Sequence, residues 1–206
     1  GGVAFVVRRV LQRFHKRKFL LFAMLAILML IPGALTGAGS VTVLIVGGMV
    51  ATVLGYMGIS RPKVAAIIFL IAGLSAAAPP VSLWAMLTAA GINMPYVGFF
   101  LPLLVPCILL ALATIYILGR KARPADLDLA LRELPEAPAG MNWLKVALPF
   151  LVFFVLVLAG RIWPFDVPIM GLPFMFVGAA VVTVLLSPRK IHVLETARRT
   201  VHQLLP

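Results

Sequence analysis

The chain has 206 residues, of which 63% are hydrophobic and 12% charged, and its mean hydropathy of +1.12 is too high for a soluble globular domain. Its formal net charge of +12 does not indicate nucleic-acid binding, because the Lys and Arg residues cluster between apolar runs without interleaved aromatic side chains to stack on bases. Residues 19–60 and 64–119 contain no Asp, Glu, Lys or Arg, and about 20 apolar residues suffice to span a bilayer. We therefore predict an all-α polytopic membrane protein.

The first predicted element, residues 1–18, is a basic amphipathic arm in which Val10 and Leu11 lie beside several arginines. A helix of this composition is typical of a segment that lies at the cytoplasmic membrane interface. A calmodulin-type target or a nucleic-acid patch is the alternative. The interfacial arm is favoured because such charge commonly flanks membrane spans.

The apolar part of the chain continues with a predicted helical hairpin over residues 19–58, which is either re-entrant or two full spans. Residues 64–90 predict a membrane helix broken by two adjacent prolines, and residues 97–119 predict a full span. Residues 120–142 form a charged loop. The last predicted unit, residues 143–206, holds two spans and a second basic amphipathic arm.

The basic residues also predict an orientation. If residues 1–18 are cytoplasmic, the predicted spans place every Lys and Arg except Arg161 on the cytoplasmic side. We therefore expect a multi-pass protein of the inner (plasma) membrane with residues 120–142 in the cytoplasm. Cys107, the only cysteine, lies in an apolar run and is interpreted as a small packing residue.

The side chains that enzymes use are nearly absent from the sequence. His15, His192 and His202 lie in basic flanks, without metal-binding spacing or cysteine partners. The sequence contains no GxSxG nucleophile elbow and no GxxxxGK[ST] phosphate-binding loop. Asp126 and Asp128 lie in the charged loop, where solvation is the ordinary interpretation. We predict that the chain is not an enzyme and has no catalytic residue, metal site or cofactor.

The first candidate binding segment is IPGALTGAGSVTV, residues 31–43. No acidic or basic residue lies deep in an apolar run, so a site for a charged ligand there must use neutral oxygens and helix ends. Gly37 and Gly39 permit a tight reversal, after which the next helix would direct its first N–H groups at the tip. Hydroxyl groups are supplied by Thr36, Ser40 and Thr42.

The second candidate segment is SAAAPPVS, residues 75–82. Pro79 and Pro80 remove two amide donors, so the carbonyl groups of the preceding turn lose their helical partners. At membrane depth such carbonyls persist only where protein or a water-filled cavity satisfies them, and transporters use them to hold cations. Ser82 would cap the helix that follows.

Both segments also have purely structural interpretations. Gly33 and Gly37 match a GxxxG helix-packing face, and TGAG matches an external turn. The proline pair matches a plain helix kink packed by residues 76–78. The residues alone leave these alternatives open.

The order of these motifs resembles the large membrane (permease) subunit of TRAP-type transporters, within the ion-transporter superfamily. PGALTGAGSVTV is similar to that family's Pro-Gly-Gly segment and Gly-Ser-Ser hairpin tip, GISRP to its Gly-Tyr-x-Pro turn, and APPVS to its Ile-Pro-Pro-Ser break. The resemblance covers residues 1–119 and, more weakly, residues 142–206. The chain departs from the family at Ala38, where serine is favoured, and at Val81, which displaces Ser82 by one place.

The resemblance implies an inverted-repeat fold in which residues 19–119 form the first-repeat transport unit, and we expect the sequence to be about half of a longer chain. It implies a secondary active transporter that takes up a small organic anion, such as a dicarboxylate, by Na+ symport and an elevator movement. Implied partners are the lipid bilayer, a small membrane subunit and a periplasmic substrate-binding protein. The implied half-site consists of Thr36, Gly37, Gly39, Ser40, Ala78, Pro79, Pro80 and Ser82.

Two other functions stay open at this point. One is a different anion transporter or an ion/proton antiporter of the same superfamily. The other is a non-transporting membrane scaffold subunit, in which TGAG and APPVS only shape helix packing.

Overall fold

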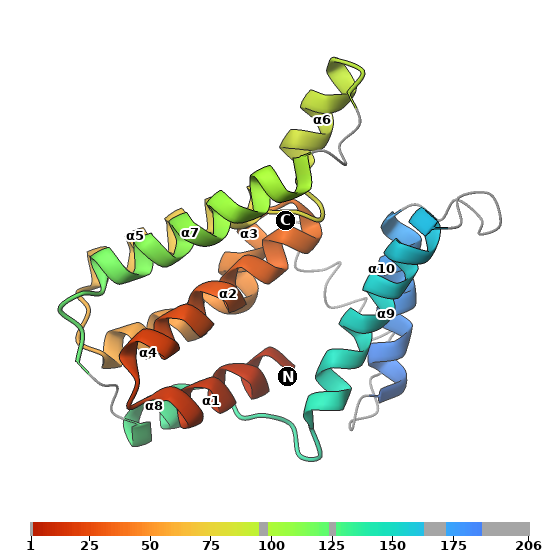
Figure 1. Ribbon diagram of the computed structural model, residues 1–206. Helices are drawn as coiled ribbons and strands as arrows, with labels where there is room; N and C mark the ends of the chain where they lie inside the picture. The colour runs from red at the N-terminus through yellow and green to blue at the C-terminus, as the bar shows by residue number, and fades with distance from the viewer. Residues whose placement is uncertain (1, 95–98, 124–126, 163–171, 187–206) are drawn as a thin grey trace, which may run out of the picture. The chain divides into compact units, whose positions relative to one another are not determined.

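The computed structural model of the chain describes residues 2–94, 99–123, 127–162 and 172–186. Within these ranges every regular element is a helix, which confirms the predicted all-helical class (Figure 1). The chain divides into two compact units, one of residues 6–136 and one of residues 1–5 with 137–206. The second predicted basic arm, which begins at Pro188, lies outside the described residues.

Among the described residues, three helical segments are long and apolar enough to cross a membrane. They are α2 (Lys18–Thr36), the segment Gly39–Tyr56, and α7 (Phe100–Leu118). The middle segment consists of α3 (Gly39–Thr42), the π-helix η1 (Val43–Gly47) and α4 (Gly48–Tyr56). Length and composition thus support the predicted membrane character. Both legs of the predicted hairpin have the length of a full crossing, while the number of crossings stays a prediction.

Two shorter helices complete the apolar part of this unit. α5 (Arg61–Ala77) follows the hairpin, and α6 (Leu83–Gly91) follows the proline pair. α5 packs against both α2 and α7, and α2 also packs against α7 (Figure 1). That α5 and α6 together make one interrupted membrane helix stays a prediction.

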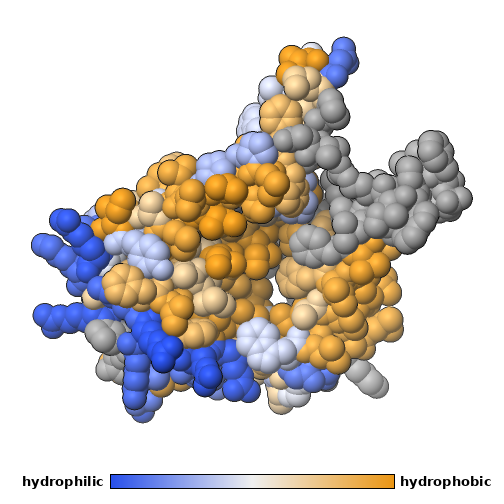
Figure 2. Space-filling view, viewed as in Figure 1, coloured by the Kyte–Doolittle hydropathy of each residue, from blue (hydrophilic) through white to orange (hydrophobic). Residues whose placement is uncertain are grey.

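The core of the unit lies where α2, α5 and α7 meet. Its apolar side chains recur at the three- and four-residue spacing of one helical face. They include Leu21, Phe22, Leu25 and Met29 on α2, Ile67 and Ile71 on α5, and Ala111 and Ile115 on α7. The outer faces are apolar as well, since Leu44 is 84% exposed and Phe69 is 77% exposed. Hydrophobic residues cover much of the surface seen in Figure 2. Water opposes such exposure and lipid does not, so the outer surface also fits a membrane environment.

One end of this bundle is basic (Figure 2). Lys18, at the start of α2, donates from Nζ to the carbonyl oxygen of Arg120 at 3.0 Å, just beyond the end of α7. The N–H of Arg123 donates to the carbonyl oxygen of Met57 at 2.9 Å, which joins the same turn to the end of α4. The reversal between α2 and α3, at the other end of α2, contains no charged residue. This asymmetry accords with the positive-inside pattern.

Residues 6–14 of α1 (Gly2–Phe14) present a buried apolar side and an exposed basic side. Val7 and Leu11 are fully buried, whereas Arg13 is exposed. The predicted charged loop contains a short helix, α8 (Leu127–Glu133). The location of residues 1–18 at a membrane interface stays a prediction.

The second unit contains α9 (Trp143–Ile162) and α10 (Leu172–Leu186), which pack against each other. The rings of Phe5 and Trp143 meet edge to face with their centroids 5.4 Å apart. Both helices are apolar and overlap the two spans expected in residues 143–206. Their crossing of a membrane stays a prediction.

Candidate functional site

The first candidate segment reverses direction at Gly37. α2 ends at Thr36, and Gly37 has a φ of +70°, the left-handed conformation that glycine adopts without steric cost. Its N–H donates to the carbonyl oxygen of Gly33 at 2.6 Å, which closes the last turn of α2. α3 begins at Gly39 after one extended residue, Ala38. The predicted reversal is confirmed, and residues 33–40 are called the tip below.

The second candidate segment separates α5 from α6. α5 ends at Ala77, Ala78 is extended, and α6 begins at Leu83. Prolines have no N–H, so Pro79 and Pro80 cannot donate to the carbonyls four residues earlier, as a continuous helix would require. Residues 78–82 are called the break below.

The tip and the break lie side by side and share a backbone hydrogen bond. The N–H of Val81 donates to the carbonyl oxygen of Ala34 at 2.9 Å. In a continuous helix that N–H would serve the carbonyl of Ala77 instead. The two segments that the sequence singled out independently are therefore in direct contact.

Glycines make this close approach possible. A β-carbon on Gly37 would lie 2.9 Å from the carbonyl oxygen of Val81. A β-carbon on Gly33 would overlap Ser75, and one on Gly39 would overlap the carbonyl oxygen of Ala72. Close contacts of this kind are typical of a GxxxG helix-packing face. They support the interpretation of Gly33 and Gly37 as such a face, and Gly37 also forms the turn at the end of α2.

A buried chain of hydrogen bonds connects α2, α3 and α5 beneath the tip. The N–H of Gly33 donates to Thr42 Oγ1 at 3.0 Å, Thr42 Oγ1 lies 2.8 Å from Ser75 Oγ, and Ser75 Oγ donates to the carbonyl oxygen of Ala72 at 2.7 Å. A serine hydroxyl has one hydrogen, so Thr42 must be the donor to Ser75. Both side chains are 0% exposed. The chain is thus fully satisfied and has a defined direction.

Of the three hydroxyl groups predicted as ligands in the first segment, two are exposed and one is buried. Thr36 is exposed and donates to the carbonyl oxygen of Pro32 at 2.8 Å, while it accepts from the N–H of Ala38 at 3.4 Å. Ser40 is exposed at the start of α3. Thr42, in contrast, is committed to the buried chain.

The predicted residues of the break are mostly buried. Ala78 is 2% exposed and packs in a small cluster with Ala34 and Cys107, in agreement with the packing role predicted for this cysteine. Pro79 is buried and Pro80 half-buried. Ser82 occupies the residue before α6, but its side chain makes no capping hydrogen bond, so the predicted cap is wrong. The N–H of Val81, the residue before Ser82, donates instead to the carbonyl oxygen of Ala34.

The chemistry available at the tip and the break is that of neutral oxygens. Neither segment contains a charged residue.

Comparisons with protein-family models, curated proteins and solved structures found no match.

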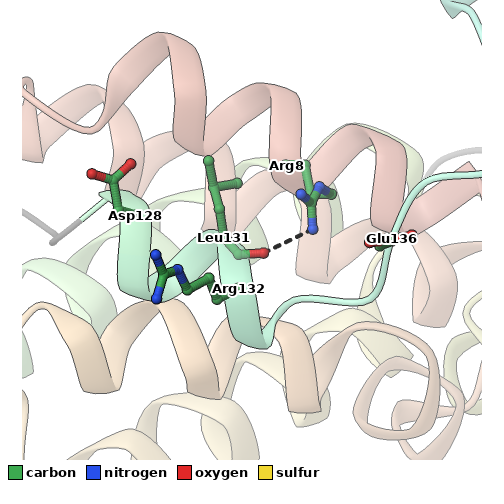
Figure 3. A pocket seen from close by; sticks show the side chains of 5 residues that line it. All are labelled: Arg8, Asp128, Leu131, Arg132 and Glu136. Atoms are coloured by element: carbon green, nitrogen blue, oxygen red, sulfur yellow. Dashed lines mark hydrogen bonds between the residues drawn. The ribbon is translucent and has the colours of Figure 1, made fainter.

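A separate polar pocket of about 420 Å³ lies between α1 and α8 (Figure 3). Arg8 extends to the end of α8 and donates from Nη1 to the carbonyl oxygens of Leu131 and Leu134, at 2.9 and 2.8 Å. A cation at this end of a helix satisfies carbonyls that have no intrahelical donor. Arg8 therefore fastens α8 to α1. The remaining lining residues are Asp128, Arg132 and Glu136.

We expect Arg8→Gln to detach α8, because a shorter and uncharged side chain cannot bridge the same two carbonyls. Hydrogen exchange of the amides of α8 should become roughly tenfold faster, the effect of losing about 1.4 kcal/mol of local stability. Arg132→Gln is the matched control, since Arg132 is exposed on α8 itself. Equal exchange rates in Arg8→Gln and the unaltered protein would show that Arg8 does not hold the helix.

Proposed function

We propose that the chain is a membrane subunit of a secondary active transporter that couples Na+ to the uptake of a small organic anion, such as a dicarboxylate, across the inner membrane. The tip and the break would form one wall of the binding site. The observation that carries the proposal is the hydrogen bond from Val81 to Ala34, which holds a helix end and an interrupted backbone against each other. Paired helix ends of this kind are how secondary transporters bind ions.

The absence of charge at the two segments suggests why a cation would be required. An organic anion needs positive charge, and the tip and the break contain no Lys, Arg or His. Carbonyl oxygens freed of helical donors by Pro79 and Pro80, together with the exposed hydroxyl of Ser40, are suitable ligands for Na+. Bound Na+ would then supply the charge, and the N-terminus of α3 a further favourable dipole. Anion binding would thus depend on Na+.

The test is uptake by the full-length protein reconstituted in liposomes. Labelled succinate should accumulate with an inward Na+ gradient and should not accumulate when K+ replaces Na+. Uptake that does not depend on Na+ would exclude the proposed coupling. If the transporter uses the implied small subunit and binding protein, uptake will also require that these be added.

We expect Ser40→Ala to raise the Na+ concentration for half-maximal uptake on the order of tenfold, because one oxygen ligand worth about 1.4 kcal/mol is lost. Its thermal stability should not change, since Ser40 is exposed. Thr88→Ala on α6 is the control, as its hydroxyl bonds only to the carbonyl oxygen of Trp84, at 2.9 Å. A Ser40→Ala protein with unaltered Na+ dependence would remove Ser40 from the proposed site.

The tight packing under the tip favours a second candidate, a non-transporting scaffold subunit. Thr42 and Ser75 satisfy each other, and three glycines contact α5 or the break closely. In a scaffold these contacts serve only stability. Pro80→Ala distinguishes the two, because a transporter would lose uptake while it remains folded, whereas a scaffold would change only in stability.

A further inference from the structure

Three turns that are distant in the sequence meet at the basic end of the unit of residues 6–136. Lys18 Nζ donates to the carbonyl oxygens of Arg120 and Ala122, at 3.0 and 3.4 Å, which joins the turn before α2 to the turn after α7. Arg123 N–H donates to Met57 O at 2.9 Å, which adds the turn between α4 and α5. The cations of the three turns are therefore brought to one end of the bundle (Figure 2).

The basic side chains of these turns and of the first turn of α5 are exposed. We call them the basic collar, and they are Lys16, Arg17, Arg61, Lys63, Arg120, Lys121 and Arg123. Residues 1–125 contain no Asp or Glu, so these turns supply no acid of their own. Backbone carbonyls engage Lys18 within the turns, but they do not neutralise its charge. Such a concentration of positive charge attracts anionic groups.

Exposed apolar side chains border the collar directly. Phe19, which follows Lys18, is 69% exposed, and Ile117, the residue before the end of α7, is 66% exposed. The charged backbone of a nucleic acid would offer no apolar surface to these side chains. An anionic phospholipid has a negative headgroup next to apolar acyl chains. It therefore matches both the basic collar and the apolar side chains beside it.

We propose that the basic collar binds the headgroups of anionic phospholipids, with their acyl chains against the exposed apolar side chains at the start of α2 and the end of α7. This inference does not rest on the proposed transport function. The collar selects anionic over zwitterionic lipids, because the ammonium group of a zwitterionic headgroup cancels the attraction of the phosphate.

The experiment compares lipids retained by the full-length protein in detergent, as counted by native mass spectrometry. Phosphatidylglycerol and phosphatidylcholine with identical acyl chains are the probes. We expect phosphatidylglycerol to bind at least roughly tenfold more tightly, and K121Q/R123Q to remove most of this preference. R61Q/K63Q, at the start of α5, should act in the same direction.

The matched control is R132Q/K145Q, which removes the same charge from positions outside the collar, and it should retain the preference. Circular dichroism and thermal unfolding establish that the collar variants are folded, so that a lost preference cannot result from misfolding. Equal retention of the two lipids by the unaltered protein, or an unchanged preference in both collar variants, would overturn the proposal. Displacement of phosphatidylglycerol by inorganic phosphate or by an oligonucleotide at micromolar concentration would also overturn it, because the collar would then recognise a soluble anion.

Discussion

Replacing Gly33 with alanine is expected to destabilise the protein by about 3 kcal/mol. The new β-carbon would overlap the side chain of Ser75 and lie 2.8 Å from its carbonyl carbon. A rotamer change of Ser75 does not relieve the second contact, so α2 and α5 must separate. This movement would also stretch the hydrogen bonds through Thr42. Thermal unfolding of the purified protein should shift downward by roughly 10 °C, the shift that such a loss produces in a domain of this size.

Gly73→Ala is the matched control for this experiment. Gly73 lies on α5, two residues before Ser75, and a β-carbon there would meet nothing within 4 Å. Because alanine is the better helix former, the control should be unchanged or more stable by about 0.5–1 kcal/mol. If both variants lost the same stability, the close contact between α2 and α5 would not determine the effect of Gly33→Ala.

Sequence reasoning located those features that depend on the backbone chemistry of single residues. Gly37 was expected to reverse the chain, and its positive φ is confirmed because glycine alone has no β-carbon to oppose it. The absence of N–H groups in Pro79 and Pro80 likewise directed attention to residues 75–82 before any contact was known. The helical class and the apolar helices followed from long charge-free runs, because a bilayer requires satisfied backbone groups.

The partners of these residues could not be predicted, because they are set by how α2 and α5 pack. Thr42 was grouped with the hydroxyls of the first segment, yet it bonds to Ser75 of the second segment, whose hydroxyl had been given no role. The sequence signal for this packing was the small-residue pair Gly33 and Gly37, because such a pair predicts that another helix approaches closely. The π-helix Val43–Gly47 has no residue signature in this sequence, and it was missed.

Thr42→Val is the second change for which we expect a large effect, a loss of about 2 kcal/mol in stability. Valine has nearly the shape of threonine, so the change removes the central hydroxyl without opening a cavity. The N–H of Gly33 would then lose its hydroxyl acceptor and Ser75 Oγ its donor, at a place where the side chains of Thr42 and Ser75 are fully buried. Thr52→Val is the control, because Thr52 lies on α4 and bonds only to the carbonyl oxygen of Gly48, at 3.1 Å. This control should change stability by less than about 0.5 kcal/mol.

Cys107 provides a local measurement of the same effect. It is the only cysteine in the sequence, and it packs against Ala34 of the tip and Ala78 of the break. If the hydroxyl chain holds the tip on the break, Thr42→Val should increase the rate of Cys107 alkylation by N-ethylmaleimide on the order of tenfold. Thr42→Ser keeps the hydroxyl and should restore most of the slow rate.

In a double-mutant cycle of Thr42→Val with Ser75→Ala, the two changes should couple by about 1 kcal/mol in stability, because each removes a partner of the other. Additive effects in this cycle would show that the two hydroxyls act independently and that the hydrogen bond between them does not hold the tip on the break.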